Sequence, residues 1–196
     1  DVRVGTEATP ERINALNADV VILSTGYMPV MPDVPGIDSP MAAECMDAYA
    51  HPEKIGHNVV VIGGGLVGSE MALGYAMEGK QVTVVEALDT LMTAGAEMPP
   101  IPNGQMIPDL FEHYGVKVLT RHRLTAIGDH SVTLACGEGS KTIQADSAVI
   151  AIGFRPAPSM APELAGSGAV VYEITGDNIG TIMRAIWNGY ELGNSI

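Results

Sequence analysis

The chain has 196 residues, of which 46% are hydrophobic and 5% aromatic, and it carries a formal net charge of −13 at pH 7. This hydrophobic fraction is sufficient for a core and excludes intrinsic disorder. The acidic charge and the scarcity of aromatic stacking platforms disfavour nucleic acids and anionic membranes as partners.

The first part of the chain predicts a short helix and an apolar strand before a proline-rich connector. The helix is expected within residues 7–17, because Thr9 suits the N-cap and Pro10 suits the first helical position. The apolar strand covers residues 19–24. Repeated prolines between residues 29 and 40 exclude a regular helix from this part of the connector. Two further elements are expected in this part, a strand at 2–4 and a helix at 39–49.

Residues 58–87 form the most informative segment. Val59–Ile62 is a short β-branched run, as expected of a buried parallel strand. A glycine-rich turn follows, and then a helix with Gly79 where its C-terminal end is expected. Gln81–Val85 is a second strand. The order of these elements is that of a βαβ unit.

Gly63, Gly65 and Gly68 form a G-x-G-x-x-G motif in the turn. The first glycine permits a tight turn, the second lets the backbone approach a pyrophosphate, and the third lets the helix pack closely on the sheet. The helix N-terminus offers unpaired N–H groups and the positive end of its dipole to phosphates. The motif predicts a dinucleotide site. The alternative is a glycine-rich turn in another α/β protein, such as a methyltransferase.

Glu86 ends the second strand, 18 positions after Gly68. A carboxylate at this place can accept hydrogen bonds from a ribose 2′-OH, and it repels a 2′-phosphate. Residues 87–90 contain no Lys or Arg that could bind such a phosphate. The segment therefore favours NADH over NADPH, unless Glu86 is an ordinary solvated residue at a strand end.

The remaining elements complete an α/β pattern. A second proline cluster precedes a helix at 105–114, and a third parallel strand is expected at 116–119. Alternation of apolar and polar residues predicts an antiparallel meander. The strands of the meander are expected at 124–127, 131–136 and 141–144, followed by strands at 147–152 and 169–174 and a closing helix at 179–193.

These elements predict an α/β fold with a Rossmann-like parallel sheet and an antiparallel meander. We expect the dinucleotide-binding domain at residues 56–145. The flanking pieces, 1–55 and 146–196, carry strands that end in glycine but no glycine motif of their own. They are interpreted as a second nucleotide-binding domain whose first βαβ unit is absent.

Cysteine and histidine usage indicates neither a disulfide framework nor a metal site. Cys45 and Cys136 are far apart and form no C-x-x-C motif, which favours buried thiols in a reducing cytoplasm. The five histidines lack metal-ligand spacing. No signal peptide or membrane-spanning run is visible. We therefore expect a cytoplasmic protein. Because the chain begins at Asp1 rather than Met, we also expect it to be a fragment of a longer protein. The full protein could form a homo-oligomer.

Four segments in this order resemble a known family. They are 19–36, the VVVIGGGLVGSE unit at 59–70, SAVIAIGFRP at 147–156, and VYEITGD at 171–177 with the helix after it. The resemblance is to the C-terminal FAD/NAD(P)-binding portion of the NADH:flavin oxidoreductases related to 2,4-dienoyl-CoA reductase and 2-enoate reductase. Those enzymes share this module with the pyridine nucleotide-disulfide oxidoreductases. The flanking pieces would then be a partial FAD-type domain.

The resemblance also implies roles for individual residues. Gly63, Gly65 and Gly68 would hold the NADH pyrophosphate, and Glu86 the adenosine ribose. Glu70 would lie near the nicotinamide, unless it is only an acid favoured by the helix dipole. Asp177 would bind the ribityl chain of FAD, unless it is only a helix N-cap. The other implied cofactor-binding residues are Gly64, Leu66, Val67, Ala87, Ile152 and Gly153 for NADH, and Gly26 and Gly176 for FAD.

The resemblance implies an electron-input module that passes hydride from NADH to FAD and serves reduction of an enoate- or enoyl-type substrate. We name no catalytic residue, because the cofactors carry the redox chemistry. This chain lacks the earlier glycine motif that binds FAD in the family, so FAD is expected to bind weakly or not at all. A flavin barrel with FMN and an iron–sulfur cluster would lie upstream. A non-enzymatic NAD(H)-binding module is the alternative.

Overall fold

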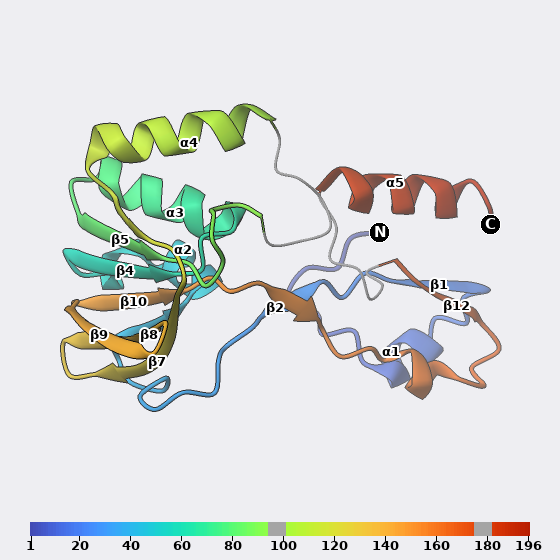
Figure 1. The fold of residues 1–196 in the computed structure, drawn as a ribbon. Coiled ribbons are helices and arrows are strands. Elements are labelled where there is room, and N and C mark those ends of the chain that lie inside the picture. Colours follow the sequence, from blue (N-terminus) through green and yellow to red (C-terminus); the bar gives the residue numbers. More distant parts are fainter. Residues whose placement is uncertain (94–100, 175–181) are drawn as a thin grey trace. The chain divides into compact units, whose positions relative to one another are not determined.

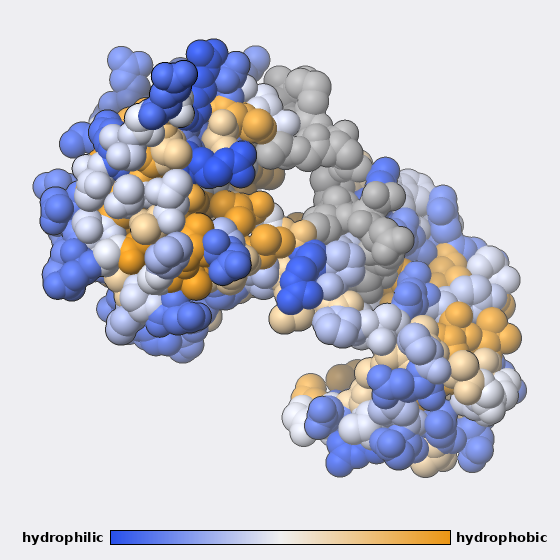
Figure 2. All heavy atoms as spheres, turned by 60° about the horizontal axis from the view of Figure 1, so that its bottom comes forward, coloured by the Kyte–Doolittle hydropathy of each residue, from blue (hydrophilic) through white to orange (hydrophobic). Residues whose placement is uncertain are grey.

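The computed structural model describes residues 1–93, 101–174 and 182–196, and it divides the chain into two compact units (Figure 1). Unit 1 consists of Asp1–Met28 and Phe154–Ile196, and unit 2 of Pro29–Gly153. The chain therefore leaves unit 1, forms the whole of unit 2, and returns. On the face drawn in Figure 2, hydrophilic residues lie around the periphery of unit 2 and hydrophobic ones gather near its middle.

Unit 2 is built on a five-stranded sheet whose neighbouring strands are all parallel. β4 and β10 lie next to each other within it, and their residues are almost entirely buried, which explains their apolar and β-branched composition. The strands in spatial order are β3 (Ala42–Glu44), β10 (Ser147–Ile150), β4 (Asn58–Ile62), β5 (Gln81–Val85) and β6 (Lys117–Leu119).

Helices cover one face of this sheet and a meander covers the other (Figure 1). The helices are α3 (Leu66–Met77) and α4 (Ile101–Tyr114), which pack against each other. The antiparallel meander consists of β7 (His122–Gly128), β8 (Ser131–Cys136) and β9 (Gly139–Gln144). Two short elements, α2 (Cys45–Ala50) and η1 (Pro52–Lys54), lead into β4.

One hydrophobic core of unit 2 lies between the sheet and the meander. β4, β5 and β10 contribute one side of it, and β7 and β8 the other, so apolar alternation in the meander places one face of each strand inward. Its buried members are Val60, Ile62, Val85, Leu124, Ile127, Val132, Leu134, Ala145, Ala148 and Ile150.

Glycine ends α3 as the sequence predicts. Gly79 follows the helix with φ +85°, and its N–H donates to the Ala76 carbonyl at 2.9 Å. The Lys80 N–H donates to the Tyr75 carbonyl at 3.0 Å. These two bonds satisfy carbonyl groups that the end of a helix leaves unpaired, and they turn the chain towards β5.

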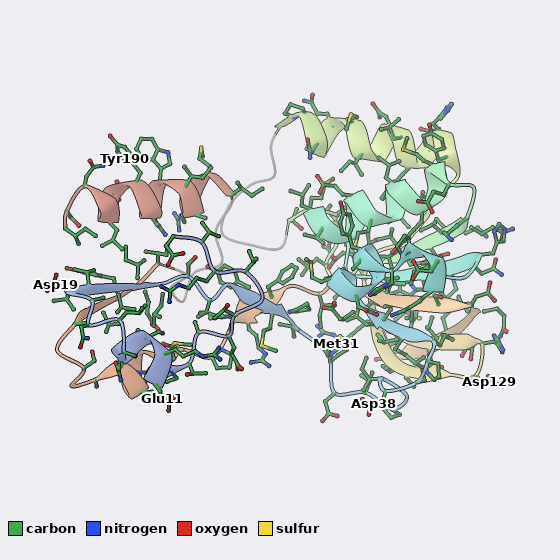
Figure 3. The ribbon with its side chains drawn as sticks, turned by 180° about the vertical axis from the view of Figure 1, so that it is seen from behind. Glu11, Asp19, Met31, Asp38, Asp129 and Tyr190 are labelled. Atoms are coloured by element: carbon green, nitrogen blue, oxygen red, sulfur yellow. The ribbon has the colours of Figure 1, made fainter. Side chains whose placement is uncertain are left out.

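The described residues of unit 1 form a parallel pair of strands, a helix and several short elements, of which β2 extends one residue beyond the unit boundary. β1 (Val20–Leu23) pairs with β12 (Val170–Glu173), with Val20 opposite Val170. α5 (Ile182–Gly193) runs beside these strands, and Tyr190 projects from it on the side away from them (Figure 3). The other elements are α1 (Pro10–Asn14), η2 (Ala161–Leu164) and the paired strands β2 (Tyr27–Pro29) and β11 (Phe154–Pro156).

The observed elements confirm the predicted α/β fold and differ from it in detail. The two compact units divide at 28/29 and 153/154, because β3 and β10 hydrogen bond into the same sheet as β4. The assignment of residues 56–145 to an NADH-binding domain, with a partial FAD-type domain at 1–55 and 146–196, stays a prediction. Residues 2–4 form no strand, and 39–49 contains β3 as well as the start of α2. Helix α4 begins at Ile101 and continues through Pro108, earlier than predicted.

Candidate cofactor-binding site

The turn between β4 and α3 needs a glycine at its first position. Gly63 has φ +107°, a conformation that L side chains rarely adopt. Its N–H donates to the Val85 carbonyl at 2.8 Å, which ties the turn to the end of β5. A Cβ atom at Gly63 would overlap the backbone carbonyl of Ala151, the residue that follows β10. The turn therefore passes between the ends of β5 and β10, the strands on either side of β4, where only backbone fits.

The third glycine brings the helix close to the turn. A Cβ atom at Gly68 would overlap the Gly63 carbonyl oxygen and lie 3.3 Å from the Ala151 Cβ atom. Ser69 is fully buried beside it, and its hydroxyl donates to the Gly64 carbonyl at 3.2 Å. The first turn of α3 is thus held against the glycine turn by close backbone contact and one side-chain hydrogen bond.

The N-terminus of α3 faces open space. Gly65 is its N-cap and has no side chain to accept a hydrogen bond from the first turn. No atom of the described residues lies within 4 Å of a Cβ atom placed at Gly65. The first N–H groups of a helix have no acceptor within it, and they lie at the positive end of its dipole. Backbone donors beside an open approach fit the phosphates of a dinucleotide.

Glu86 is buried at the end of β5 and holds the glycine turn. Glu86 is only 6% exposed, which excludes the alternative of an ordinary solvated acid at a strand end. Oε2 accepts a hydrogen bond from the Gly64 N–H at 2.7 Å, and Oε1 accepts one from the Leu88 N–H at 2.7 Å. Each carboxylate oxygen has a second lone pair, so the side chain retains capacity to accept a ribose hydroxyl.

The backbone of Glu86 links β5 to the next strands. Its N–H donates to the Leu119 carbonyl at 2.8 Å, and its carbonyl accepts from the His122 N–H at 2.9 Å. The Met92 N–H donates to the Gly64 carbonyl at 2.7 Å. Residues from the ends of β5 and β6 therefore surround the turn, at the carboxyl edge of the sheet where ligands bind in open α/β folds.

Other predicted NADH-contacting residues lie in the same unit. Leu66 and Val67 open α3. Glu70 is exposed on α3, and its Oε1 accepts a hydrogen bond from the Asn103 side-chain amide of α4 at 2.9 Å. Ile152 follows β10 and is 42% exposed. Gly153 has φ +117°, and Ala87 is exposed next to Glu86.

The predicted flavin-contacting residues are described in part. Gly26 belongs to unit 1, has φ +79°, and accepts a hydrogen bond from the Ala157 N–H at 3.0 Å. Gly176 and Asp177 lie outside the described residues. The structure thus places Glu86 and the start of α3 beside the glycine turn, and the assignment of these and the other named residues to NADH or FAD stays a prediction.

Sequence reasoning did not identify several residues around the site. Ala151 sets the space for the turn, and an alanine after a strand gives no local signal of this role. Ser69 was detectable as a polar residue in the first turn of an apolar helix. Arg121 has φ +56° and forms a bidentate ion pair with Asp89. In the sequence, the basic residues 121–123 look like an ordinary solvated strand end.

The described residues, 1–93, 101–174 and 182–196, contain neither a membrane-spanning helix nor a cluster of metal-ligating side chains. In this part of the chain no helix is long and apolar enough to cross a membrane. The same residues contain no group of three or more His, Cys, Asp or Glu side chains placed to hold a metal ion.

Comparison with known proteins establishes the family. Residues 3–173 match the family described as pyridine nucleotide-disulphide oxidoreductase, and the chain belongs to it. This match confirms the resemblance inferred from the glycine motif and the three other segments. It also confirms the Rossmann-type fold class.

Individual relatives agree with this assignment. The chain is 31% identical to a cinnamate reductase of Clostridium sporogenes, over 100% of this chain and 29% of that protein. It is 33% identical to an NADH oxidase of Thermoanaerobacter brockii, over 98% of this chain and 30% of that protein. A solved 2-naphthoyl-CoA reductase complex superposes with a TM-score of 0.88 at 29% identity, covering 99% of this chain and 29% of that one. The chain therefore spans less than a third of these proteins.

Proposed function

We propose that unit 2 binds NADH at the carboxyl edge of its parallel sheet. One observation carries the proposal: in a member of this family, a buried carboxylate at the end of β5 holds a glycine turn that opens onto a helix N-terminus. Gly63, Gly65 and Gly68 would shape the pyrophosphate cradle, with N–H donors from Leu66 and Val67. The other proposed contacts are Gly64, Glu70, Glu86, Ala87, Ile152 and Gly153.

Preference for NADH over NADPH is part of the proposal. The Glu86 carboxylate is buried and anchored through both oxygens, so it is positioned to accept a bond from a ribose 2′-OH. A 2′-phosphate at the same place would meet a fixed negative charge without an adjacent cation in residues 87–90. Like charges brought together in a partly desolvated site disfavour the phosphorylated cofactor.

We further propose that this chain is the NADH-binding input of a longer flavoenzyme that reduces an unsaturated, enoate- or enoyl-type substrate. NADH supplies a hydride, and FAD bound with the help of unit 1 is the proposed acceptor. Within this chain, Gly26, Gly176 and Asp177 are the proposed FAD contacts. Support comes from the family and from relatives named as cinnamate and 2-naphthoyl-CoA reductases. FMN and an iron–sulfur cluster are proposed for an upstream flavin barrel domain.

Calorimetric titration of the chain with NADH and NADPH tests the first step. We expect NADH to bind more tightly than NADPH, and Glu86→Ala to weaken NADH because it removes both the ribose acceptor and the anchor of the glycine turn. Asp129→Asn is the matched control, since Asp129 is a solvent-exposed acid at the β7–β8 turn (Figure 3). Equal affinities, or no binding of NADH, would contradict the proposal.

A further inference from the structure

An ion pair lies at the edge of the proposed adenosine site. The Arg121 Nε atom lies 2.7 Å from Asp89 Oδ1, and its Nη2 atom 3.1 Å from Asp89 Oδ2. This is a bidentate arrangement, in which both donors on one side of the guanidinium are used by one carboxylate. Both side chains are mostly exposed, at 74% and 69%. A phosphate group could therefore reach the guanidinium if the Asp89 carboxylate were removed.

Backbone hydrogen bonds fix Arg121 next to Glu86. The Arg121 N–H donates to the Leu88 carbonyl at 3.0 Å, and the following residue, His122, donates its N–H to the Glu86 carbonyl at 2.9 Å. The Leu88 N–H in turn donates to the Glu86 carboxylate. Arg121 also has φ +56°, and these contacts hold that uncommon conformation in place. Its guanidinium pairs with Asp89, in the loop that leaves Glu86.

We propose that Asp89 is a specificity-determining residue that keeps Arg121 from binding a 2′-phosphate. The inference rests on the proposed NADH site. Asp89 occupies the Nε and Nη2 donors of the Arg121 guanidinium, and it adds a second negative charge three residues after Glu86. A 2′-phosphate entering beside Glu86 must displace this carboxylate before it can use Arg121. NADH carries no such phosphate, so its affinity should not depend on the Asp89–Arg121 pair.

The test compares Kd for NADPH with Kd for NADH in four forms of the chain: wild type, D89N, R121Q and D89N/R121Q. We expect D89N to lower the NADPH-to-NADH Kd ratio by about threefold to tenfold, because a released arginine can bind phosphate. R121Q in the wild-type background should change the ratio by less than about twofold, since Asp89 already holds the guanidinium. In the D89N background, R121Q should abolish the gain.

Controls separate this role from simple removal of charge or loss of structure. D129N removes the same formal charge at the β7–β8 turn, the position labelled in Figure 3, and should leave the ratio unchanged. The D89N gain should also shrink as salt is raised, because exposed charges are screened. An unchanged ratio in D89N, or an equal gain in D89N/R121Q, would overturn the inference. Absence of NADH binding to the wild type would instead overturn the proposed function.

Discussion

Replacing Gly63 by alanine is the sharpest perturbation of the site, because two independent penalties meet there. The residue has φ +107°, and an added Cβ atom would overlap the backbone carbonyl of Ala151. The obstructing atom belongs to the main chain between β10 and β11, so no side-chain rotation can relieve the contact. Either the turn or the end of β10 must move.

Other glycines of the same βαβ unit separate the two penalties. Gly79 has φ +85°, but a Cβ atom there would meet no atom of the described residues within 4 Å, so Gly79→Ala measures backbone strain alone. Gly74 lies inside α3 with the same open surroundings, and Gly74→Ala measures helix propensity alone.

The expected changes in the free energy of unfolding follow from these environments. Gly74→Ala should stabilise by about 0.5–1 kcal/mol, because alanine loses less conformational entropy in a helix. Gly79→Ala should destabilise by about 1–2 kcal/mol through left-handed strain. Gly63→Ala should destabilise by about 2–5 kcal/mol, because overpacking against backbone adds about 1–3 kcal/mol to the strain. The last value is a large part of the stability of a typical domain.

Urea unfolding followed by far-UV circular dichroism measures this series, and NADH titration follows for each variant. The chain's single tryptophan, Trp187, lies in unit 1, so tryptophan fluorescence would not report on the glycine turn in unit 2. We expect Gly63→Ala to lose NADH affinity while Gly74→Ala keeps it. A Gly63→Ala variant as stable as Gly79→Ala would refute the argument from the Ala151 carbonyl.

Two further predictions concern groups outside the site. Tyr75 is 5% exposed, its pKa is raised to about 12 chiefly by burial, and its hydroxyl has no hydrogen-bond partner among the described residues. Tyr75→Phe should therefore raise the free energy of unfolding by about 1 kcal/mol in urea titrations, and a clear loss would show that the hydroxyl is satisfied. The pKa of Asp146 is lowered chiefly by the Asn58 backbone N–H, which donates to its carboxylate at 2.8 Å. A carboxylate whose pKa is lower in the folded state stabilises the fold at pH values above its unfolded pKa, and this contribution is lost as the pH falls through the folded-state pKa. Asp146→Asn removes this titration, so it should make the free energy of unfolding less dependent on pH on the acid side. An unchanged acid limb would contradict this assignment.

The βαβ unit could be predicted from sequence because its signals are local. The β-branched run of β4, the glycine turn, the Gly79 end of α3 and the acid after β5 all lie within 30 residues. Each has a conformational reason that needs no knowledge of the rest of the chain. The structure confirms the placement of all four elements.

The unit boundaries could not be predicted, because they depend on contacts between distant segments. β3 pairs with β10 across roughly 100 residues of sequence, and neither strand carries a sign of its partner. The same holds for the Ala151 carbonyl beside Gly63 and for the Asp89–Arg121 pair. The prolines also led to a predicted start of α4 that is too late. Pro102 lies in the first turn of α4, where a missing N–H costs little, and α4 accommodates Pro108 in its interior.

Amide hydrogen exchange of the chain with and without saturating NADH tests the proposed site most directly. We expect slower exchange at residues 65–67, whose N–H groups begin α3, and at 86–88, where the hydrogen bonds of Glu86 meet the proposed ribose site. The β7–β9 meander should keep the exchange rates of the free protein. Protection confined to the meander or to unit 1, with residues 65–67 unchanged at saturation, would contradict the placement of NADH at the glycine turn.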